Sequence, residues 1–369
     1  MSDSRKNTMN LLQLPDDVLR TALPQAIMSL NSRAQFMATL SGTCKSLNSF
    51  FQPKLDQQLL LTLVLKPTQA NIEKAKKMYT ANPGLLFIES EAEEYAAGLD
   101  ETLKNVHRIV RASPIRAMVG AGDIWLLKEV IETDEFKKYI DPKSKKTANE
   151  LAAAEIKKQF PNGFEFPPST YDYGPLIDAI TNDQSLIQNN APSDVTKALL
   201  AQFRKDFLPD PDRVVTSGHF FNLNELVRAF ELYDANWAPW NGNQLSLFWR
   251  QVIGYFEGLV SGVMGEVISQ GIMNVIDGAA PKRQYDFDNY VTDKKESYFP
   301  HAVDPTYRLG LSFGVDSYYA GAGRRLVNSG GWSRRVPDAV GYKTYVEQQQ
   351  RAWTNLCCSC SNNHANKRL

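Results

Sequence analysis

Three cysteines near the end of the chain form the densest group of reactive side chains. Cys357, Cys358 and Cys360 are followed by His364, and thiolates with imidazole are ligands that zinc prefers. These residues supply one Cys-x-x-Cys pair and one imidazole without a second pair, so no metal site is expected. Clustered cysteines beside basic residues also fit S-acylation at Cys357, Cys358 or Cys360, with peripheral contact of the basic tail to an anionic membrane. A solvated, flexible tail is the alternative.

Other side chains with catalytic chemistry are sparse. The chain has four imidazoles, at His107, His219, His301 and His364. It has no His-Glu-x-x-His, no Gly-x-Ser-x-Gly, no Walker loop and no complete dinucleotide fingerprint. His219 beside Ser217 is the best candidate for a Ser-His-Asp triad, although this segment also fits a loop before a helix at Leu223. We therefore expect no catalytic residue and no cofactor.

An aromatic segment offers the other candidate pocket. Trp237 and Trp240 flank a proline turn, and Phe248 and Trp249 follow. Aromatic residues line ligand pockets, but at helical spacing they more often fill a core. We interpret this segment as core and keep a pocket around Trp237 and Trp240 as the alternative.

The elements that would position these residues are predominantly helical. Ala, Leu, Lys, Glu and Gln dominate most segments, and alternating β-branched runs of five or more residues are absent, so we predict an all-α fold. Pro53 is expected to interrupt the first helical region, and loops are expected at residues 141–150, 161–174 and 208–213. Gly254, Gly258 and Gly262 recur every four residues, which predicts one helical stripe in close contact with another helix.

Composition limits the class of partner. The chain has 369 residues, 43% hydrophobic and 22% charged, which predicts two or three folded units and excludes global disorder. Its 41 Lys and Arg balance 41 Asp and Glu, so we expect no nucleic-acid partner. Residues 321–369 carry eight basic side chains against two acidic ones. A start without a signal-peptide core and only four cysteines predict a soluble protein of a reducing compartment.

Residues 9–53 resemble an F-box. A Leu-Pro pair and a short apolar helix are followed, about twenty-five residues later, by a Cys-Lys-x-Leu helix, and the positions that carry this pattern are Leu14, Pro15, Val18, Leu19, Cys44, Lys45 and Leu47. The chain departs from the family at Leu47, where Trp is commoner, and in a longer, more polar segment between the helices. The resemblance implies docking of an apolar helical face onto a Skp-type adaptor of a cullin-RING ubiquitin ligase. The alternative is a helical pair that caps the next domain.

Residues 112–131 resemble an ankyrin repeat. Residues 113–115, Ser-Pro-Ile, stand where Thr-Pro-Leu opens the first helix, and Gly122 and Asp123 form the turn before the second helix. Arg116 stands where the family has His. Weaker echoes on either side imply about three degenerate repeats, and the alternative is an irregular helical bundle.

The expected order of domains combines these resemblances. It comprises an F-box-like module (9–53), ankyrin-like helical repeats (56–190), a C-terminal helical domain (191–320) and a basic, Cys-containing flexible tail (321–369). This combination resembles the F-box and ankyrin effectors that intracellular bacteria deliver into host cells by type IV secretion. The resemblance implies a non-enzymatic adaptor in the host cytosol. Its two partners would be a host Skp-type adaptor and an unknown target protein. A host-acting enzyme and a membrane-tethered structural scaffold are the alternatives.

Overall fold

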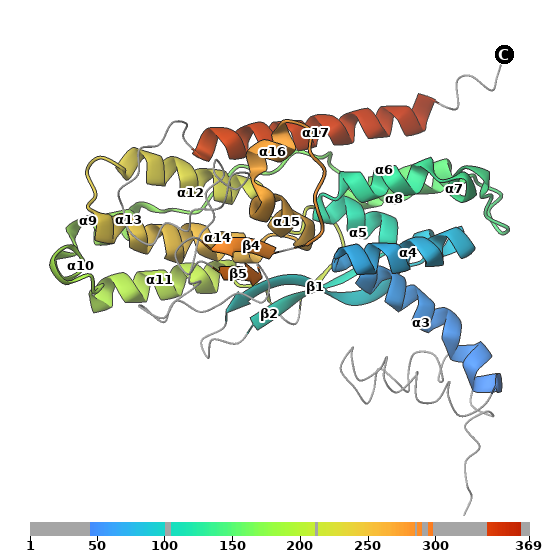
Figure 1. Ribbon diagram of the computed structural model, residues 1–369, viewed down its shortest axis with the longest axis horizontal. Coiled ribbons are helices and arrows are strands. Elements are labelled where there is room, and N and C mark those ends of the chain that lie inside the picture. The colour runs from blue at the N-terminus through green and yellow to red at the C-terminus, as the bar shows by residue number, and fades with distance from the viewer. Residues whose placement is uncertain are drawn as a thin grey trace, which may run out of the picture.

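The computed structural model describes residues 45–99, 105–210, 213–284, 286–289, 294–297 and 338–362 (Figure 1). Most of these residues are helical, as the sequence predicted, and a small sheet is added to the helices. The F-box-like positions Leu14, Pro15, Val18, Leu19 and Cys44 lie outside the described residues. Lys45 and Leu47 lie in the first turns of helix α3.

The first half of the described chain packs into one hydrophobic core, which we call the first core. Its members include Leu61, Met118 and Leu127, all of which are buried. Its elements are α3 (Lys45–Leu65), α4 (Gln69–Ala81), the 3₁₀ turn η3 (Pro83–Phe87), β1 (Ser90–Leu99), β2 (Asn105–Ala112), α5 (Pro114–Ala121), α6 (Ile124–Glu132), α7 (Asp134–Lys138) and α8 (Ala148–Gln159).

Short polar residues set the helix boundaries in this core. Ser113 accepts the backbone N–H of Arg116 at the start of α5, and Asp123 accepts that of Leu126 at the start of α6. Gly122, at φ 82°, ends α5 in the left-handed conformation that glycine adopts without strain. The helix-turn-helix that the sequence predicted at Gly122 and Asp123 is therefore confirmed.

The sheet corrects the expectation of an all-α fold. β1 pairs with β2 in antiparallel register from Ser90↔Ala112 to Leu99↔Asn105, with an irregularity between Glu93 and Ala97. The short strand β3 (Val214–Val215) joins β2 in parallel. The sequence of β1, SEAEEYAAGL, is rich in Ala and Glu, which favour helices. Tertiary packing decides against this local preference, because β1 contacts α3 and α14.

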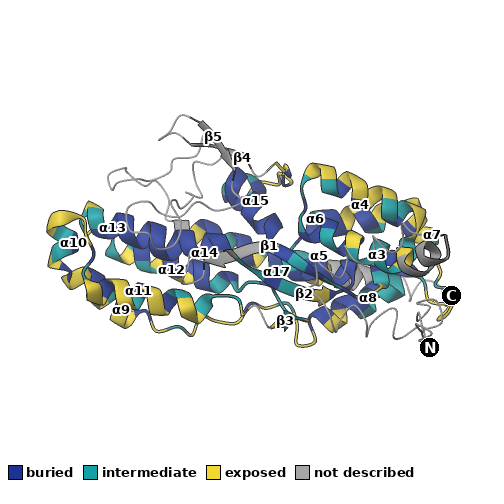
Figure 2. Ribbon diagram, turned by 90° about the horizontal axis from the view of Figure 1, so that it is seen from below, coloured by how far each residue is buried: buried dark blue, intermediate teal, exposed yellow. Residues whose placement is uncertain are grey.

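The second half of the chain forms a second core. It includes Phe203, Phe230, Trp249 and Phe256, all fully buried. The elements around it are α9 (Gly174–Asn182), α10 (Gln184–Asn189), α11 (Asp194–Phe207), α12 (Leu223–Asn236), α13 (Gly242–Phe248), the π-helical turn η4 (Trp249–Ile253), α14 (Gly254–Leu259), α15 (Gly262–Gln270) and α16 (Ile272–Ile276). A two-stranded ribbon, β4 (Asp286–Asn289) and β5 (Lys294–Ser297), follows. Exposed residues gather on the outer sides of α9, α10 and α11 (Figure 2).

The predicted division at residue 190 lies elsewhere in the structure. The first core includes Phe160, whereas Phe166, Tyr173 and Leu176 already belong to the second. The change occurs in the loop after α8, one of the loops that the sequence predicted. α9 and α10, which were expected to belong to the repeats, pack with α11 and α13 instead.

Helix α17 (Asp338–Asn362) contradicts the prediction of a flexible tail over most of that segment. It lies across both halves of the molecule (Figure 1) and contacts α12, α16 and α8. Tyr342, Tyr345 and Val346 are buried in the second core, and Trp353 is buried in the first. Tyr342, Tyr345 and Trp353 recur at helical spacing, and burying their rings stabilises the packed helix. Residues 356–362 continue α17 through Cys357, Cys358 and Cys360.

Two smaller expectations are also corrected. α3 continues through Pro53, and Leu60, Leu61 and Val64 near its end are buried. The predicted glycine stripe is broken, because the chain leaves the helix at Val260 and restarts at Gly262 with Ser261 as the cap.

Gly258 remains a buried residue of α14. We expect Gly258→Leu to lower the free energy of unfolding by about 2 kcal/mol or more, because a large side chain overpacks the second core. The measurement is urea unfolding followed by circular dichroism. Ala198→Leu, on the exposed face of α11, is the matched control and should change stability little. An unchanged midpoint for Gly258→Leu would contradict close packing at this position.

Candidate functional site

The two cores meet along a boundary crossed by buried, charged side chains, which we call the core junction. Arg108, Arg116 and Arg283 lie there, each no more than 8% exposed. A guanidinium removed from water needs hydrogen-bond acceptors that replace its hydration. Each of the three finds an acceptor on the opposite side of the junction or on the chain that crosses it.

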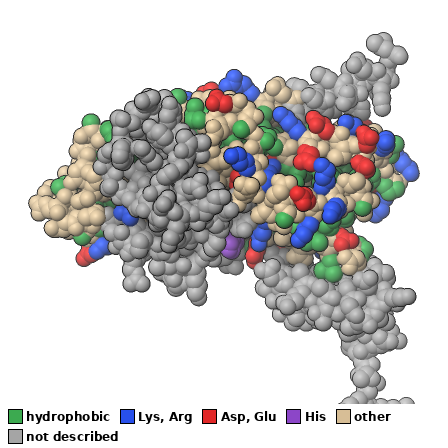
Figure 3. All heavy atoms as spheres, viewed as in Figure 1, with side chains coloured by type: hydrophobic (Ala, Val, Ile, Leu, Met, Phe, Trp, Pro, Cys, Tyr) green, Lys and Arg blue, Asp and Glu red, His purple; other side chains and the backbone are tan. Residues whose placement is uncertain are grey.

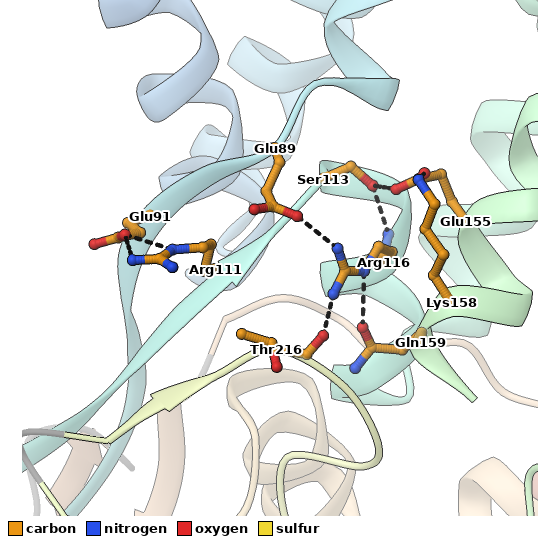
Figure 4. Close-up of polar contacts among 9 residues, drawn as sticks. All are labelled: Glu89, Glu91, Arg111, Ser113, Arg116, Glu155, Lys158, Gln159 and Thr216. Carbon is orange, nitrogen blue, oxygen red and sulfur yellow. Dashed lines mark hydrogen bonds and ion pairs between the residues drawn. The ribbon is translucent and has the colours of Figure 1, made fainter. Parts of the chain in front are cut away.

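Arg116 is the centre of the first group (Figure 4). It lies in the first turn of α5, and its Nη1 donates to Glu89 Oε2 at 2.8 Å. Its Nε donates to Gln159 Oε1 on α8 at 3.3 Å, and its Nη2 donates to the carbonyl of Thr216. One side chain thus connects the start of β1, two helices and the segment that leads into the second core.

The neighbours of Arg116 extend the same group. Ser113 Oγ donates to Glu155 Oε2 at 2.6 Å, and Lys158 pairs with the other oxygen of that carboxylate at 2.6 Å (Figure 4). Gln159 exchanges two hydrogen bonds of 2.6 Å with Gly218, using its side-chain amide and its main-chain carbonyl. These contacts fix the segment 214–219 against α8.

Arg108 and Glu94 form the second group, on the hairpin. Arg108 Nη1 is 2.8 Å from Glu94 Oε2, and its Nη2 donates to the carbonyl of Leu259 at the end of α14. Burial raises the pKa of Glu94 to about 7, against the opposing effect of Arg108. Burial also lowers the pKa of Arg108. The pair holds the hairpin at the break between α14 and α15.

Asp123 and Arg283 form the third group. Two parallel hydrogen bonds of 2.7 Å join the guanidinium to the carboxylate, which also caps α6. Nearby, Ser261 Oγ donates to the carbonyl of Ala121 at 2.6 Å while it caps α15. The turn between α5 and α6 is therefore bound to the second half of the chain from two sides.

A small cavity of about 20 Å³ lies within the junction. Its lining includes Gly120, His219, Ser261 and Gln349. This volume holds about one water molecule. The cavity is thus too small for an organic substrate.

His219, the best triad candidate in the sequence, lies beside this cavity but makes no triad. Its ring stacks on Phe166 at 3.7 Å and lies 4.4 Å from the ring of Phe160. Its Nε2 is 2.9 Å from the carbonyl of Phe164, and burial lowers its pKa to about 4. Ser217 is exposed to solvent. The histidine is therefore a neutral ring of the packing at pH 7.

The aromatic segment is largely core, as interpreted from the sequence. Trp240 is buried and its Nε1 donates to Thr181 Oγ1 at 2.9 Å, and Phe248 and Trp249 are fully buried. Trp237 is partly buried against the same core. A much larger hollow, an open crevice of about 800 Å³, lies elsewhere, between residues 162–165 and α17.

Several predicted positions have no described side chain. Among the F-box-like residues, Lys45 and Leu47 are placed by their backbone in α3, and the rest lie outside the described residues. The backbone of the three tail cysteines lies in α17. Within the described residues, no group of three or more His, Cys, Asp or Glu side chains is arranged to hold a metal ion, and no helix is long and apolar enough to span a membrane.

The three junction arginines do not stand out as a group in the sequence. Arg116 stood out only as a departure from a repeat pattern. A usable signal was present, because Arg116 lies alone among apolar residues in the helix PIRAMVGA. A charged residue within an apolar stretch is buried only with partners. The partners of the junction arginines are distant in the sequence, by as much as 160 residues for Arg283 and Asp123.

Comparison with protein-family models, curated proteins and solved structures gives no match to this chain. The F-box and ankyrin resemblances therefore rest on the residues quoted for them.

Arg116 has a matched control in Arg111, which pairs with Glu91 at an exposed position, 47% and 21% exposed (Figure 4). We expect Arg116→Met to lower the free energy of unfolding by about 3 kcal/mol, because it leaves Gln159 and the Thr216 carbonyl without their donor. Arg111→Met should cost less than about 1 kcal/mol. Denaturant unfolding of both variants measures the difference. Equal losses of unfolding free energy would show that the buried contacts of Arg116 stabilise the fold no more than an exposed ion pair does.

His219 should make the free energy of unfolding depend on pH, with a sign that follows from its lowered pKa. The unfolded histidine takes up a proton below its ordinary pKa of 6.5, whereas the folded one stays neutral until about pH 4. Unfolding therefore binds a proton in this window, and stability falls as the pH is lowered, by at most about 1.4 kcal/mol per pH unit.

The control for this effect is His219→Phe, which keeps an aromatic ring beside Phe160 and Phe166 but cannot bind a proton. Urea unfolding between about pH 7 and about pH 4 should show a shallower loss for the variant than for the wild type. Parallel curves would mean that His219 is as accessible to protons in the folded state as in the unfolded one.

Proposed function

We propose that this protein is a non-enzymatic adaptor that links a host Skp-type and cullin ubiquitin ligase to a target protein. Residues 9–53 would bind the Skp-type partner, and the helical body would hold the target. The proposal places the protein in the cytosol of a host cell after type IV secretion. It rests on the F-box-like residues and on helix α3, which begins within the F-box-like segment and continues into the first core.

Helix α3 is the observation that carries the proposal. The Cys-Lys-x-Leu segment of the F-box-like pattern enters this helix at Lys45, and the same helix runs 21 residues to Leu65. Its second half is anchored in the first core through Leu60, Leu61 and Val64. A ligase adaptor has to hold its target at a set position relative to the ligase. A continuous helix between the docking motif and the body provides this without a flexible linker.

The surface of the body also favours binding over catalysis. The open crevice beside α17 is lined mainly by polar side chains such as Glu347, Gln350 and Arg351, with Phe164 at its edge. Open, polar hollows suit a folded partner, whereas catalysis needs convergent groups in a site that excludes water. Among the described residues, the small cavity at the junction holds only about one water molecule.

The two alternatives receive less support from particular residues. An enzyme with a pocket at Trp237 and Trp240 would need space there, but Trp240 is buried and bonded to Thr181. A membrane tether through Cys357, Cys358 and Cys360 stays a proposal, and it is compatible with an adaptor.

The test is a binding experiment with the full chain and a purified Skp-type adaptor. Leu14→Ala with Pro15→Ala should reduce binding at least about tenfold, because truncation of central apolar contacts costs more than about 1.4 kcal/mol. Leu59→Ala is the matched control, since Leu59 is a half-exposed leucine of α3 outside the motif. Circular dichroism checks that both variants keep the helical body. Undiminished binding by the double variant, or no binding by the wild type, would overturn the ligase proposal.

A further inference from the structure

A lysine-rich loop closes one end of the first core. Residues 137–146, KKYIDPKSKK, contain five lysines and one aspartate, and we call this segment the lysine loop. All five lysines are exposed to solvent. The segment begins with Lys137 and Lys138 in the last turn of α7 and lies at one end of the longest axis of the molecule (Figure 1). Basic side chains and neighbouring acidic ones are visible at this end in Figure 3.

The root of the lysine loop is fixed in the first core. Phe136 is 1% exposed, and the ring of Tyr139 stacks on Phe87 with centroids 5.9 Å apart. Ile140 and Thr147 form an antiparallel bridge, and the N–H of Ala148 donates to the carbonyl of Tyr139 at 3.1 Å. The loop therefore leaves and re-enters the core at neighbouring positions.

The tip of the loop is held by Asp141. Its carboxylate accepts the N–H of Ser144 at 2.6 Å, and its carbonyl accepts the N–H of Lys145 at 2.9 Å. Its own N–H donates to the carbonyl of Lys146 at 2.8 Å. The only acidic residue of the loop is thus bound mainly by the turn, and its charge also attracts that of Lys143. Because the backbone is already ordered, binding through this loop loses little conformational entropy.

The lysines differ in what they already contact. Lys137 donates to the carbonyl of Glu132, and Lys138 lies 3.8 Å from Asp134. Lys143, Lys145 and Lys146 are exposed and form no ion pair within 4 Å with any described residue. These three charges are therefore directed into solvent at the tip, while Asp134 and Glu135 lie on the helical turn before the root.

An exposed apolar side chain accompanies the charges. Ile140 is 58% exposed, among the highest values for large hydrophobic residues in the described part of the chain. Lysines around an exposed isoleucine match the two components of peripheral membrane binding, electrostatic attraction and burial of apolar surface. Lysine also fits dispersed lipid phosphates, since it acts as a point charge and lacks the paired donors of arginine.

We propose that the lysine loop is a binding site for an anionic lipid surface. Its exposed lysines at one end of the long axis are accessible to a flat bilayer. Lys143, Lys145 and Lys146 would supply the attraction, and Ile140 would enter the headgroup region. This site is separate from the cysteines of α17 and needs no acylation.

The test is sedimentation of the full-length, unmodified protein with lipid vesicles. Wild type should bind phosphatidylcholine vesicles that contain about 30% phosphatidylserine and should not bind pure phosphatidylcholine. Lys143→Gln with Lys145→Gln and Lys146→Gln should weaken binding about a hundredfold, at about fivefold for each charge. Ile140→Ser should weaken it by a smaller factor. Binding should also fall as salt is raised, because the Debye length shortens.

The matched control is Lys74→Gln with Lys77→Gln and Lys205→Gln, which removes the same charge from exposed positions elsewhere. It should bind as wild type does. Equal weakening in the control, or full binding by the loop variant, would show that net charge or another segment is responsible and would overturn the proposal. So would complete displacement by about 10 mM inorganic phosphate, well below the salt that screens a membrane, because the lysines would then hold a free anion. Binding to polyglutamate or RNA without binding to vesicles would also overturn it.

Discussion

A buried guanidinium has to keep all of its hydrogen bonds at once, and this requirement organises the contact between the two cores. Arg108, Arg116 and Arg283 each join elements from different parts of the chain. An apolar boundary would allow the cores to slide, because hydrophobic contact has no preferred direction. Paired charges permit one arrangement, since displacement by an ångström leaves an uncompensated charge in the interior. The junction therefore contributes a fixed orientation more than it contributes net stability.

That fixed orientation is what an adaptor would use. α3 carries the end of the F-box-like segment into the first core, and α17 is buried in both cores through Tyr342, Tyr345 and Trp353. With the junction between them, these two helices make the described elements behave as one scaffold. Loss of any one arginine would then alter the position of a bound target even where the protein stays folded. The same rigidity keeps the lysine loop at one end, where it can meet a surface.

Local signals in the sequence predicted much of this fold. Ser113, Gly122 and Asp123 gave the correct helix boundaries because caps and left-handed turns depend on adjacent residues alone. The hairpin was missed because β1 is composed of helix-forming residues, and only contact with α3 and α14 makes it a strand. α17 was missed because the Gly- and Arg-rich sequence before it suggested a continuous flexible tail. The hydrogen-bond partners of Arg116 could not be predicted, since Glu89, Gln159 and Thr216 are distant from it in the sequence.

The pKa shifts of His219, Tyr345 and Glu94 have burial as their largest cause. At a catalytic site, burial is combined with nearby charges that set the protonation state for a reaction. Burial is the largest cause of the pKa shift of His219, whose ring contacts the carbonyl of Phe164. Burial is also the largest cause for Tyr345, where the charge of Asp123 adds to the rise in pKa and the hydrogen bond with Gln349 opposes it. Glu94 also shifts through burial, and its charged neighbour Arg108 acts in the opposite direction. None of the three faces a cavity with room for a substrate in the described part of the chain. These groups therefore belong to the packed interior, where hydrogen bonds and ion pairs offset part of the free-energy cost of burial.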